Sequence, residues 1–413
     1  MSAYARTLRD ATPNAKRYLA AVVLQNIAIG LLGTVFALYV KSVGMSTSVV
    51  GDTEGALSLA AAVVCLLLPP LVSVVGYRAL LITAAVAFGL SRLGQTLDIG
   101  PSLMVAFGLA YGIGDGIVRS IGVAFLSESG PGGSNRTLLF TVDFVLRVVA
   151  AFVGALIGGL LPEALSFAMP EAQAFRISMA LAGIVLLSSA IPVLGIRDER
   201  RLEGHPWTRY VRTVRGFRSW DRLARLAGPQ LMISVGAGLI MPFVPLFLRT
   251  HLGASVAQIG MIQGTTAIVM AAATLLTPLL ARRLGLVGTV VATELASLPF
   301  LLVIPLASGL PVVAVAMWAR SSLMNMSWPV YNQISVEGIP ARDRPLIAGW
   351  TNVAWSVAWL AGSVIGGRLA ETSYTTGYFI TAGLYAVGAV TSWLLLRHLE
   401  APAAAEQSGA ATA

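Results

Sequence analysis

Long apolar stretches alternate with short polar breaks along almost the whole chain. A helix needs about 20 apolar residues to cross the hydrocarbon core of a bilayer, and twelve stretches are long enough. They cover residues 18–40, 49–70, 77–97, 101–123, 137–161, 173–195, 228–249, 256–280, 285–307, 310–334, 345–369 and 376–397. The first is longer than the apolar core of a signal peptide, so we expect it to remain as a helix. The pattern predicts an all-α, polytopic membrane protein with twelve transmembrane helices.

Composition excludes the soluble classes. Of the 413 residues, 56% are hydrophobic and only 11% are charged, and the mean hydropathy is +0.79. Soluble domains carry about 25% charged residues, so neither a soluble globular enzyme nor a disordered chain fits. A net charge of +9 would indicate nucleic-acid binding in a soluble protein. Here most basic residues fall in loops beside the bilayer, and no nucleic-acid partner is expected.

Residues that bind metals or nucleotides are scarce. Cys65 is the only cysteine, and the three histidines, His205, His251 and His398, lie far apart in the sequence. Neither lysine follows a glycine, as a phosphate-binding loop requires. We therefore expect no metal, no cofactor and no enzymatic activity.

Basic residues are distributed unequally between alternate loops. With a cytoplasmic N-terminus, the inside segments hold twenty of the 28 basic residues and the outside segments five, Arg92 among them. Because cytoplasmic loops are enriched in Lys and Arg, both termini are predicted to be cytoplasmic. The 26 arginines against two lysines are typical of a GC-rich bacterial genome and favour a bacterial cytoplasmic (inner) membrane.

One long polar stretch divides the chain. The predicted organisation is a cytoplasmic N-terminus (1–17), a six-helix bundle (18–195), a basic cytoplasmic linker (196–227), a second six-helix bundle (228–398) and a disordered tail (399–413). In the linker, Trp207, Val211, Val214 and Phe217 recur at helical spacing, with arginines on the other faces. This is typical of an amphipathic helix on an anionic leaflet, and a merely solvated basic linker is the alternative.

The two halves carry an internal repeat. At an offset of 209 residues, Gly44, Gly51, Gly55, Pro69, Gly76 and Glu128 match Gly253, Gly260, Gly264, Pro278, Gly285 and Glu337. At 208, Arg136, Gly154, Gly158 and Gly159 match Arg344, Gly362, Gly366 and Gly367. Ordered matches of this kind predict two pseudo-symmetric bundles with a binding site between them, near the bilayer midplane.

Twelve spans in two halves, a long basic central loop and cytoplasmic termini resemble the major facilitator superfamily of secondary transporters, over nearly the whole chain. The family's loop motif between helices 2 and 3 resembles Gly76-Tyr77-Arg78, without its aspartate, and its second copy resembles Ala281-Arg282-Arg283-Leu284-Gly285. The resemblance implies a cytoplasmic gate that latches the halves. Its residues would be Arg78, Glu128, Arg136, Arg282, Arg283, Glu337 and Arg344.

Helix 5 bears on the direction of transport. Its Gly154-Ala155-Leu156-Ile157-Gly158-Gly159 resembles the antiporter signature of drug exporters, with alanine in place of proline, and favours export. The alternative is close helix packing, since glycines four residues apart allow it and helix 11 repeats the pattern. The arginine that such exporters carry early in helix 4 is absent, and Gly108 stands near its place.

Charges inside the predicted spans are the main candidates for the site. A charge at the bilayer centre costs about 2.5–3.5 kcal/mol, so each needs a partner or a purpose. Asp115 and Arg119 in helix 4, and Asp143 and Arg147 in helix 5, predict a four-charge cluster paired both within and between the two helices. It is either a structural network or a proton-coupling site in which Asp115 or Asp143 exchanges a proton.

Arg320 lies near the middle of helix 10, and its repeat position in helix 4 is Tyr111. By the resemblance Arg320 would face the central cavity and hold an anionic substrate group. The alternative is a structural pair with Glu294, which is also a proton-coupling candidate. Further substrate-binding candidates, on helices that line the family's cavity, are Gln25, Asn26, Asn325, Asn352, Trp355 and Trp359. Asp52 and Glu54 are expected to be solvated.

These observations predict a secondary transporter that works by alternating access. We expect proton-coupled export of a small amphipathic or anionic molecule, such as a drug or metabolite. A nutrient or metabolite importer on the same scaffold is the first alternative, and a non-transporting receptor or scaffold is the second. The expected partners are the small-molecule substrate, a proton or other coupling ion and the lipid bilayer, with the protein as a monomer.

Overall fold

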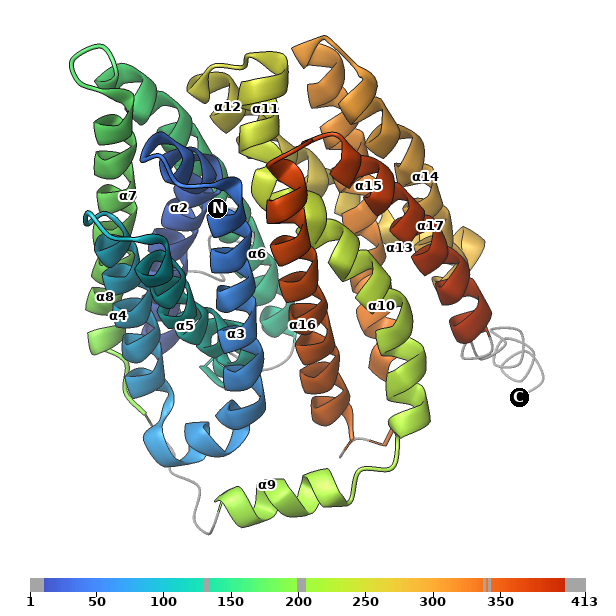
Figure 1. The fold of residues 1–413 in the computed structure, drawn as a ribbon. Coiled ribbons are helices and arrows are strands. Elements are labelled where there is room, and N and C mark those ends of the chain that lie inside the picture. The colour runs from blue at the N-terminus through green and yellow to red at the C-terminus, as the bar shows by residue number, and fades with distance from the viewer. Residues whose placement is uncertain (1–10, 130–133, 199–205, 337–338, 341–342, 398–413) are drawn as a thin grey trace.

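The computed structural model describes residues 11–129, 134–198, 206–336, 339–340 and 343–397 (Figure 1). Over these residues the chain is helical and contains no strand. The first half comprises α2 (Pro13–Ser42), α3 (Thr47–Val75), α4 (Tyr77–Gln95), α5 (Pro101–Ser129), α6 (Ser134–Leu165), α7 (Glu171–Ser188) and α8 (Ala190–Leu194). The second comprises α10 (Trp220–Ile240), η1 (Met241–Phe243), α11 (Val244–Leu252), α12 (Val256–Thr274), α13 (Thr277–Leu284), α14 (Leu286–Leu306), α15 (Leu310–Val336), α16 (Arg344–Ala370) and α17 (Thr376–Leu396). A short helix, α9 (Pro206–Arg215), lies between the halves in sequence.

All twelve predicted spans correspond to helices, which confirms the all-α fold. Three are interrupted: α7 continues into α8, α10 into η1 and α11, and α12 into α13. Pro242 and Pro278 lie at two of the breaks, where a proline cannot donate a helical hydrogen bond. The first bundle starts at Pro13 rather than at residue 18, and the second at Trp220 rather than at 228, so the linker is shorter than the sequence predicts.

Within the described residues, ten helical segments are long and apolar enough to cross a membrane. Neither α4 nor α15 is among them, and both contain a buried arginine, Arg92 in α4 and Arg320 in α15. These two helices still pack inside their bundles, α4 against α5 and α15 against α14. Burial in protein therefore replaces the apolar surface that they lack.

The molecule has two ends, which we name by their contents. The linker end carries α9 and the turns at Gly76 and Gly285, and here Asn14 donates a hydrogen bond to the carbonyl of Arg197 at 2.9 Å. The opposite, far end carries the loops after Ser42, Gln95, Leu252 and Ala370. Spanning helices run between the two ends, and α9 lies crosswise beyond them at the linker end (Figure 1).

The sequence repeat appears in the packing between the halves. Helix α3 packs on α16, and α6 packs on α12. A Cβ at Gly51 would overlap the carbonyl oxygen of Ser363, and one at Gly260 would overlap that of Ala155. Gly51 matches Gly260, and Ala155 matches Ser363, at the offsets of the repeat. The two seams are therefore copies of one close helix contact related by pseudo-twofold symmetry.

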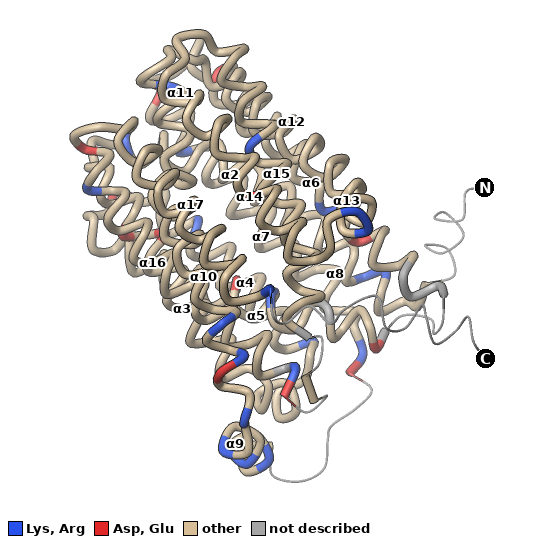
Figure 2. Tube along the Cα trace, turned by 90° about the vertical axis from the view of Figure 1, so that its right-hand side faces the viewer, with Lys and Arg blue, Asp and Glu red and all other residues tan. Residues whose placement is uncertain are grey.

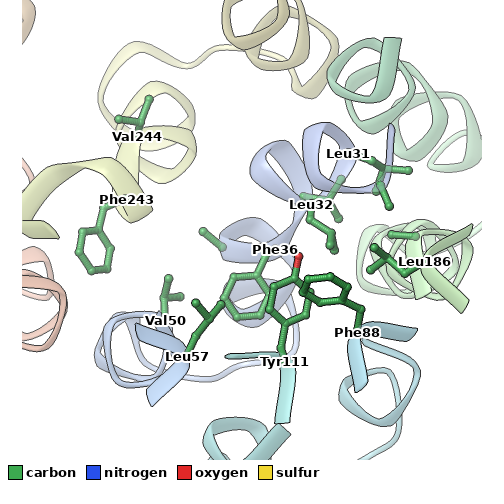
Figure 3. Packing of buried hydrophobic residues seen from close by; sticks show 14 of the residues in the cluster. Leu31, Leu32, Phe36, Val50, Leu57, Phe88, Tyr111, Leu186, Phe243 and Val244 are labelled. Atoms are coloured by element: carbon green, nitrogen blue, oxygen red, sulfur yellow. The ribbon is translucent and has the colours of Figure 1, made fainter. Parts of the chain in front are cut away.

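A continuous apolar core fills the first bundle and reaches into the second. Figure 3 shows Phe36, Phe88 and Tyr111 gathered in this core, between α2, α4 and α5. A smaller cluster lies at the linker end of the second bundle. We call it the linker-end cluster; it contains Phe217, Leu223, Leu226, Val287, Val290, Val330, Tyr331, Ile334, Ile339, Leu346, Ile347 and Leu396.

Candidate functional site

The first half contains a polar cavity of about 250 Å³, the N-half cavity, between α2, α5 and α6. Gln25 and Asn26 reach it from α2. All four charges of the predicted cluster line it as well, Asp115 and Arg119 from α5 and Asp143 and Arg147 from α6. The structure thus gathers six of the predicted site residues around one space.

The four charges form two ion pairs, each within one helix. Arg119 Nε lies 2.6 Å from Asp115 Oδ2, and Arg147 Nε lies 2.8 Å from Asp143 Oδ2. Arg147 also donates to the hydroxyl of Tyr18 at 3.1 Å. Among the described ion pairs none joins α5 to α6, so the expected pairing between the two helices is not formed.

Helix packing explains this difference. The cross-helix pairing assumed that helices 4 and 5 are neighbours in an antiparallel hairpin. In the structure α5 packs on α3 and α4, whereas α6 packs on α2 and α12. The charges therefore face a shared cavity instead of a helix seam. The side chain of Asp115 is 18% exposed and that of Arg119 57%, so ions and solutes can reach this pair.

The second half contains a smaller cavity of about 110 Å³, the C-half cavity, lined in part by Arg320 and Ser321 of α15 and Gln263 and Thr266 of α12. Arg320 is 5% exposed. Its guanidinium donates to the hydroxyl of Tyr385 at 2.6 Å and lies 3.6 Å from the sulfur of Met241. Within the described residues no carboxylate forms an ion pair with it.

Glu294 does not pair with Arg320, as one interpretation of the sequence predicted. It is 1% exposed, and neither of its carboxylate oxygens has a hydrogen-bond partner among the described groups. It lies instead within electrostatic range of Tyr331 and Tyr385. Arg320 is thus a cation that lines a cavity, and Glu294 is a separate buried carboxyl.

The remaining substrate-binding candidates form hydrogen bonds or ring contacts with other residues of the protein. Asn26, Asn325 and Asn352 each donate to a carbonyl four residues earlier in their own helix. Gln25 donates to the hydroxyl of Ser189 at 3.3 Å. Trp355 of α16 contacts Trp359 of the same helix, with ring centroids 6.4 Å apart. It also packs edge-on against Trp328 of α15, with ring centroids 5.2 Å apart. Of these candidates, only Gln25 and Asn26 lie at one of the two cavities described above.

Tyr111 is buried in the core and does not reach the N-half cavity. Its ring packs on Phe88 at 4.5 Å (Figure 3). The guanidinium of Arg92 lies 4.1 Å from the centroid of the Tyr111 ring. Arg92 is 3% exposed, lies 4.8 Å from the ring of Phe36 and donates to Gln95 Oε1 at 2.7 Å. The expectation that Arg92 belongs to an outer loop is therefore wrong, because its side chain turns into the bundle.

Glu54 is half-buried and lies close to this group. It interacts electrostatically with Arg92, Asp115 and Arg119, so a chain of charges extends from the N-half cavity into the first bundle. The sequence placed Glu54 in solvent because it lies near the start of helix 2. Its position one helical turn after the buried Val50 is the signal that could have placed it partly inside.

Polar contacts join the halves at the far end, and sequence reasoning missed them all. Arg368 pairs with Asp52 at 3.0 Å, and Arg249 pairs with Glu171 at 3.1 Å. Glu163 accepts from the backbone N–H of Ala257 at 2.6 Å. Gln263 donates to the carbonyl of Gly33 at 3.0 Å.

Glu371 adds a further contact at this end, just beyond α16. It accepts a hydrogen bond from the backbone N–H of Ser48 at 3.1 Å. Hydrogen bonds from Ser48 hold the pKa of the Glu371 carboxyl below its usual 4.5, and Lys41 lowers it further. Ion pairs and hydrogen bonds thus join the two halves at the far end.

Where they are described, the predicted gate residues at the linker end contact their own half or the linker. Glu128 accepts from the hydroxyl of Tyr77 at 3.1 Å, and Arg344 donates to the carbonyl of Ile339 at 3.0 Å. Arg282 and Arg283 end α13 with exposed side chains. Glu337 and the side chain of Arg136 lie outside the described residues, as do the predicted tail and residues 1–10.

The loop between α3 and α4, the second and third predicted spans, contacts a carboxylate from a distant part of the sequence. Asp198, at the start of the linker, accepts from the backbone N–H of Arg78 at 3.1 Å. It occupies the N-terminus of α4, beside Gly76, whose φ of 85° favours glycine. Asp198, from the linker, thus provides a carboxylate beside the Gly76-Tyr77-Arg78 loop, whose own motif lacks the aspartate.

No group of three or more metal-ligating side chains is close enough to hold a metal ion within the described part of the chain. The charges at the two cavities can bind ions and polar solutes. Two duplicated helical bundles, each with a polar cavity inside an apolar exterior, define a multi-pass membrane protein of the transporter type.

The comparisons agree with this class. Residues 226–412 match the family model of the Major Facilitator Superfamily. The fold is similar to that of a variant of the nucleoside transporter NupG (TM-score 0.75, 14% identity, 92% of this chain and 99% of that one covered). It is also similar to a bacterial homolog of the human lysosomal transporter Spinster in an inward-facing, occupied conformation (TM-score 0.71, 13% identity, 94% and 98% covered). A D-xylose–proton symporter aligns as well (TM-score 0.68, 17% identity, 93% and 97% covered).

At such identities these structures show a shared fold alone. No curated protein matches the chain in sequence. The family model thus matches the second half of the chain, and the two halves together have the fold of the transporters named above.

Proposed function

We propose that this protein exports a small organic anion in exchange for protons, by alternating access in a bacterial cytoplasmic membrane. The observation that carries the proposal is Arg320, a buried cation that lines the C-half cavity with no described carboxylate paired to it. A buried unpaired charge is costly, and a substrate anion would relieve that cost. Amphipathic anions fit best, because the lining also contains Met317, Ile304 and Tyr378.

Orientation follows from charge. The linker end holds α9 and most of the basic loop residues, so the positive-inside rule makes it cytoplasmic. The described polar contacts between the halves gather at the far end, which would then face the outside. We infer that the structure represents the state that is closed outside and open to the cytoplasm, in which an exporter loads its substrate.

The N-half cavity supplies the proton chemistry. When a proton binds Asp115, the ion pair with Arg119 loses its attraction, and the arginine becomes a free cation facing the cavity; Asp143 and Arg147 can act in the same way. A proton taken up outside would accompany the empty carrier inward. Its release to the cytoplasm would restore the ion pair, and the anion would then bind at Arg320.

An importer on the same scaffold is the competing function. The nucleoside transporter and the xylose–proton symporter have this fold, and the described cavities do not by themselves set a direction. The glycines of helix 5 do not set it either. Gly154 and Gly158 pack against the backbone of α2, and Gly362 and Gly366 pack in the same way against α10. Close packing accounts for the motif in both halves, while a non-transporting receptor would bind ligand without moving it.

The first experiment measures thermal stability of the detergent-solubilised protein against organic anions, lipophilic cations, sugars and nucleosides. A ligand at a hundredfold its Kd should stabilise the protein by about 2.7 kcal/mol. We expect organic anions to stabilise the wild type and Arg225→Ala, which removes an arginine that lines neither cavity, but not Arg320→Ala. Stabilisation by anions that persists in Arg320→Ala would contradict the proposal.

Direction and coupling need sealed vesicles. An inward-directed proton gradient should drive the anion out of right-side-out vesicles. The double variant Asp115→Asn/Asp143→Asn should abolish this gradient dependence but still bind the anion. Gradient-driven uptake into these vesicles would favour the importer. Binding without flux in either orientation would favour the receptor.

A further inference from the structure

The linker helix α9 carries a concentrated positive charge. Arg209, Arg212 and Arg215 lie on it and Arg218 follows it, and all four side chains are exposed. Residues 206–219 contain no acidic residue. Within the described part of the chain, none of the four forms an ion pair with a carboxylate. Their charge is therefore available to a partner outside the described protein.

One side of α9 is fixed to the bundle. Tyr210 and Val214 are partly buried against the linker-end cluster, and α9 also contacts α3 of the first half. Phe217 belongs to that cluster and is buried, although the sequence predicted it on the lipid-facing stripe. Because α9 is held by both halves, its position is defined and its remaining faces have a fixed direction.

Beside the packed side, α9 exposes apolar surface. The side chain of Trp207 is 44% exposed and that of Val211 is 42% exposed. Residues four apart lie on one face of a helix, so the two form a short stripe next to Arg215. Tryptophan favours the interface between lipid and water, where its ring is apolar and its N–H meets polar groups.

The direction of α9 matches a membrane surface. It runs crosswise to the spanning helices at the linker end (Figure 1), and Figure 2 shows it nearly end-on, carrying arginines, beyond the ends of the other helices. Its C-terminus leads within a few residues to Trp220, the first residue of the spanning helix α10. The helix therefore lies at the depth where a spanning segment leaves the hydrocarbon core.

We propose that α9 is an interfacial anchor that binds anionic phospholipids of the leaflet at the linker end. Trp207 and Val211 would enter the boundary of the acyl region, and Arg209, Arg212 and Arg215 would contact lipid phosphates. Phosphates and guanidinium groups form bidentate hydrogen bonds, which suits arginine better than a simple point charge. Each basic residue near an anionic leaflet strengthens attraction about fivefold, so the three together supply on the order of a hundredfold.

Hydrogen exchange of the full chain in lipid nanodiscs tests this proposal. The exchange rates of the amides of residues 206–219 are compared between discs of pure phosphatidylcholine and discs designed to contain 30% phosphatidylglycerol. We expect exchange to be slower in the anionic discs. The difference in exchange rate between the two kinds of disc should shrink when the designed salt concentration is raised from 0.05 to 0.5 M. Arg209→Gln/Arg212→Gln/Arg215→Gln should abolish the difference.

Two controls keep the outcome interpretable. Replacing the same three arginines with lysine keeps the charge, so the lipid dependence should persist at reduced strength. Thr208→Gln alters α9 without changing its charge and should behave like the wild type. Equal exchange in both lipids would overturn the proposal, and so would a lipid dependence that persists in Arg209→Gln/Arg212→Gln/Arg215→Gln. Either result would favour a protein partner for the exposed stripe.

Discussion

Two arginines lie inside the bundles and are stabilised in different ways. Arg92 stacks between Phe36 and Tyr111 and donates to Gln95, whereas Arg320 donates to Tyr385 and faces a cavity. A guanidinium is weakly hydrated and planar, so aromatic faces can replace part of its water. Arg92 lines neither of the two cavities and has a structural role, while Arg320 lines the C-half cavity.

A double-mutant cycle on Arg92 and Glu54 tests the buried charge chain. Arg92→Gln removes the cation that interacts most strongly with Glu54, so we expect it to lower the thermal stability in detergent by about 2–3 kcal/mol. In Arg92→Gln/Glu54→Gln part of this loss should return, with a coupling energy of about 1 kcal/mol. Additive effects of the two substitutions would show that they do not interact.

At the scale of helices, small residues decide how the halves meet. Helices α3 and α16, and α6 and α12, approach so closely that their glycine positions leave no room for a side chain. Without a hydrophobic force between helices in lipid, such backbone contact is a main source of association. Both seams lie toward the far end, so they stabilise the state in which that end is closed.

A bulky side chain at one seam should shift the equilibrium between states. We expect Gly260→Leu to open the far end and slow transport at least tenfold, because its side chain would overlap Ala155 and Gly159. Gly383→Leu is the matched control, since nothing lies within 4 Å of a Cβ there. Distances between spin labels on Asp98 and Ser308, in a Cys65→Ser background, report the opening. An unchanged distance in Gly260→Leu would contradict this role of the seam.

At the scale of the whole molecule, the far end is closed by apolar seams with charged groups around them. The ion pairs of Asp52 with Arg368 and of Glu171 with Arg249 are well exposed, so each contributes at most about 1 kcal/mol. Weak contacts of this kind hold a closed state without preventing its opening. A transporter needs that balance, because each cycle must break every one of these contacts.

Glu371 makes this closure sensitive to pH. Its pKa is lowered by the contact with Ser48, so the contact stabilises the closed state at pH above the usual 4.5 and loses this contribution as the pH falls through the lowered value. Acidifying the far side from pH 7 to below 4.5 should therefore increase the separation of the Asp98 and Ser308 labels. Glu371→Gln should reduce this pH response. A response that is identical in the two proteins would show that Glu371 does not cause it.

The sequence by itself determined the twelve spans, the duplication and the class of protein. These properties are local or periodic: apolar length, loop charge and repeated glycines follow from each segment alone. It also singled out the charged residues that line the two cavities, because a charge in an apolar span is visible without a structure. Arg320, Asp115 and Asp143 all lie where solutes can reach them.

Tertiary structure alone decided the partners of these charges. Cross-helix pairing failed because α5 and α6 are neighbours in sequence but pack on different helices. The interaction of Arg92 with Glu54, the far-end contacts and the cap that Asp198 places on α4 all join residues far apart in the chain. Which helix faces which is set by the packing of whole bundles, and no span contains that information on its own.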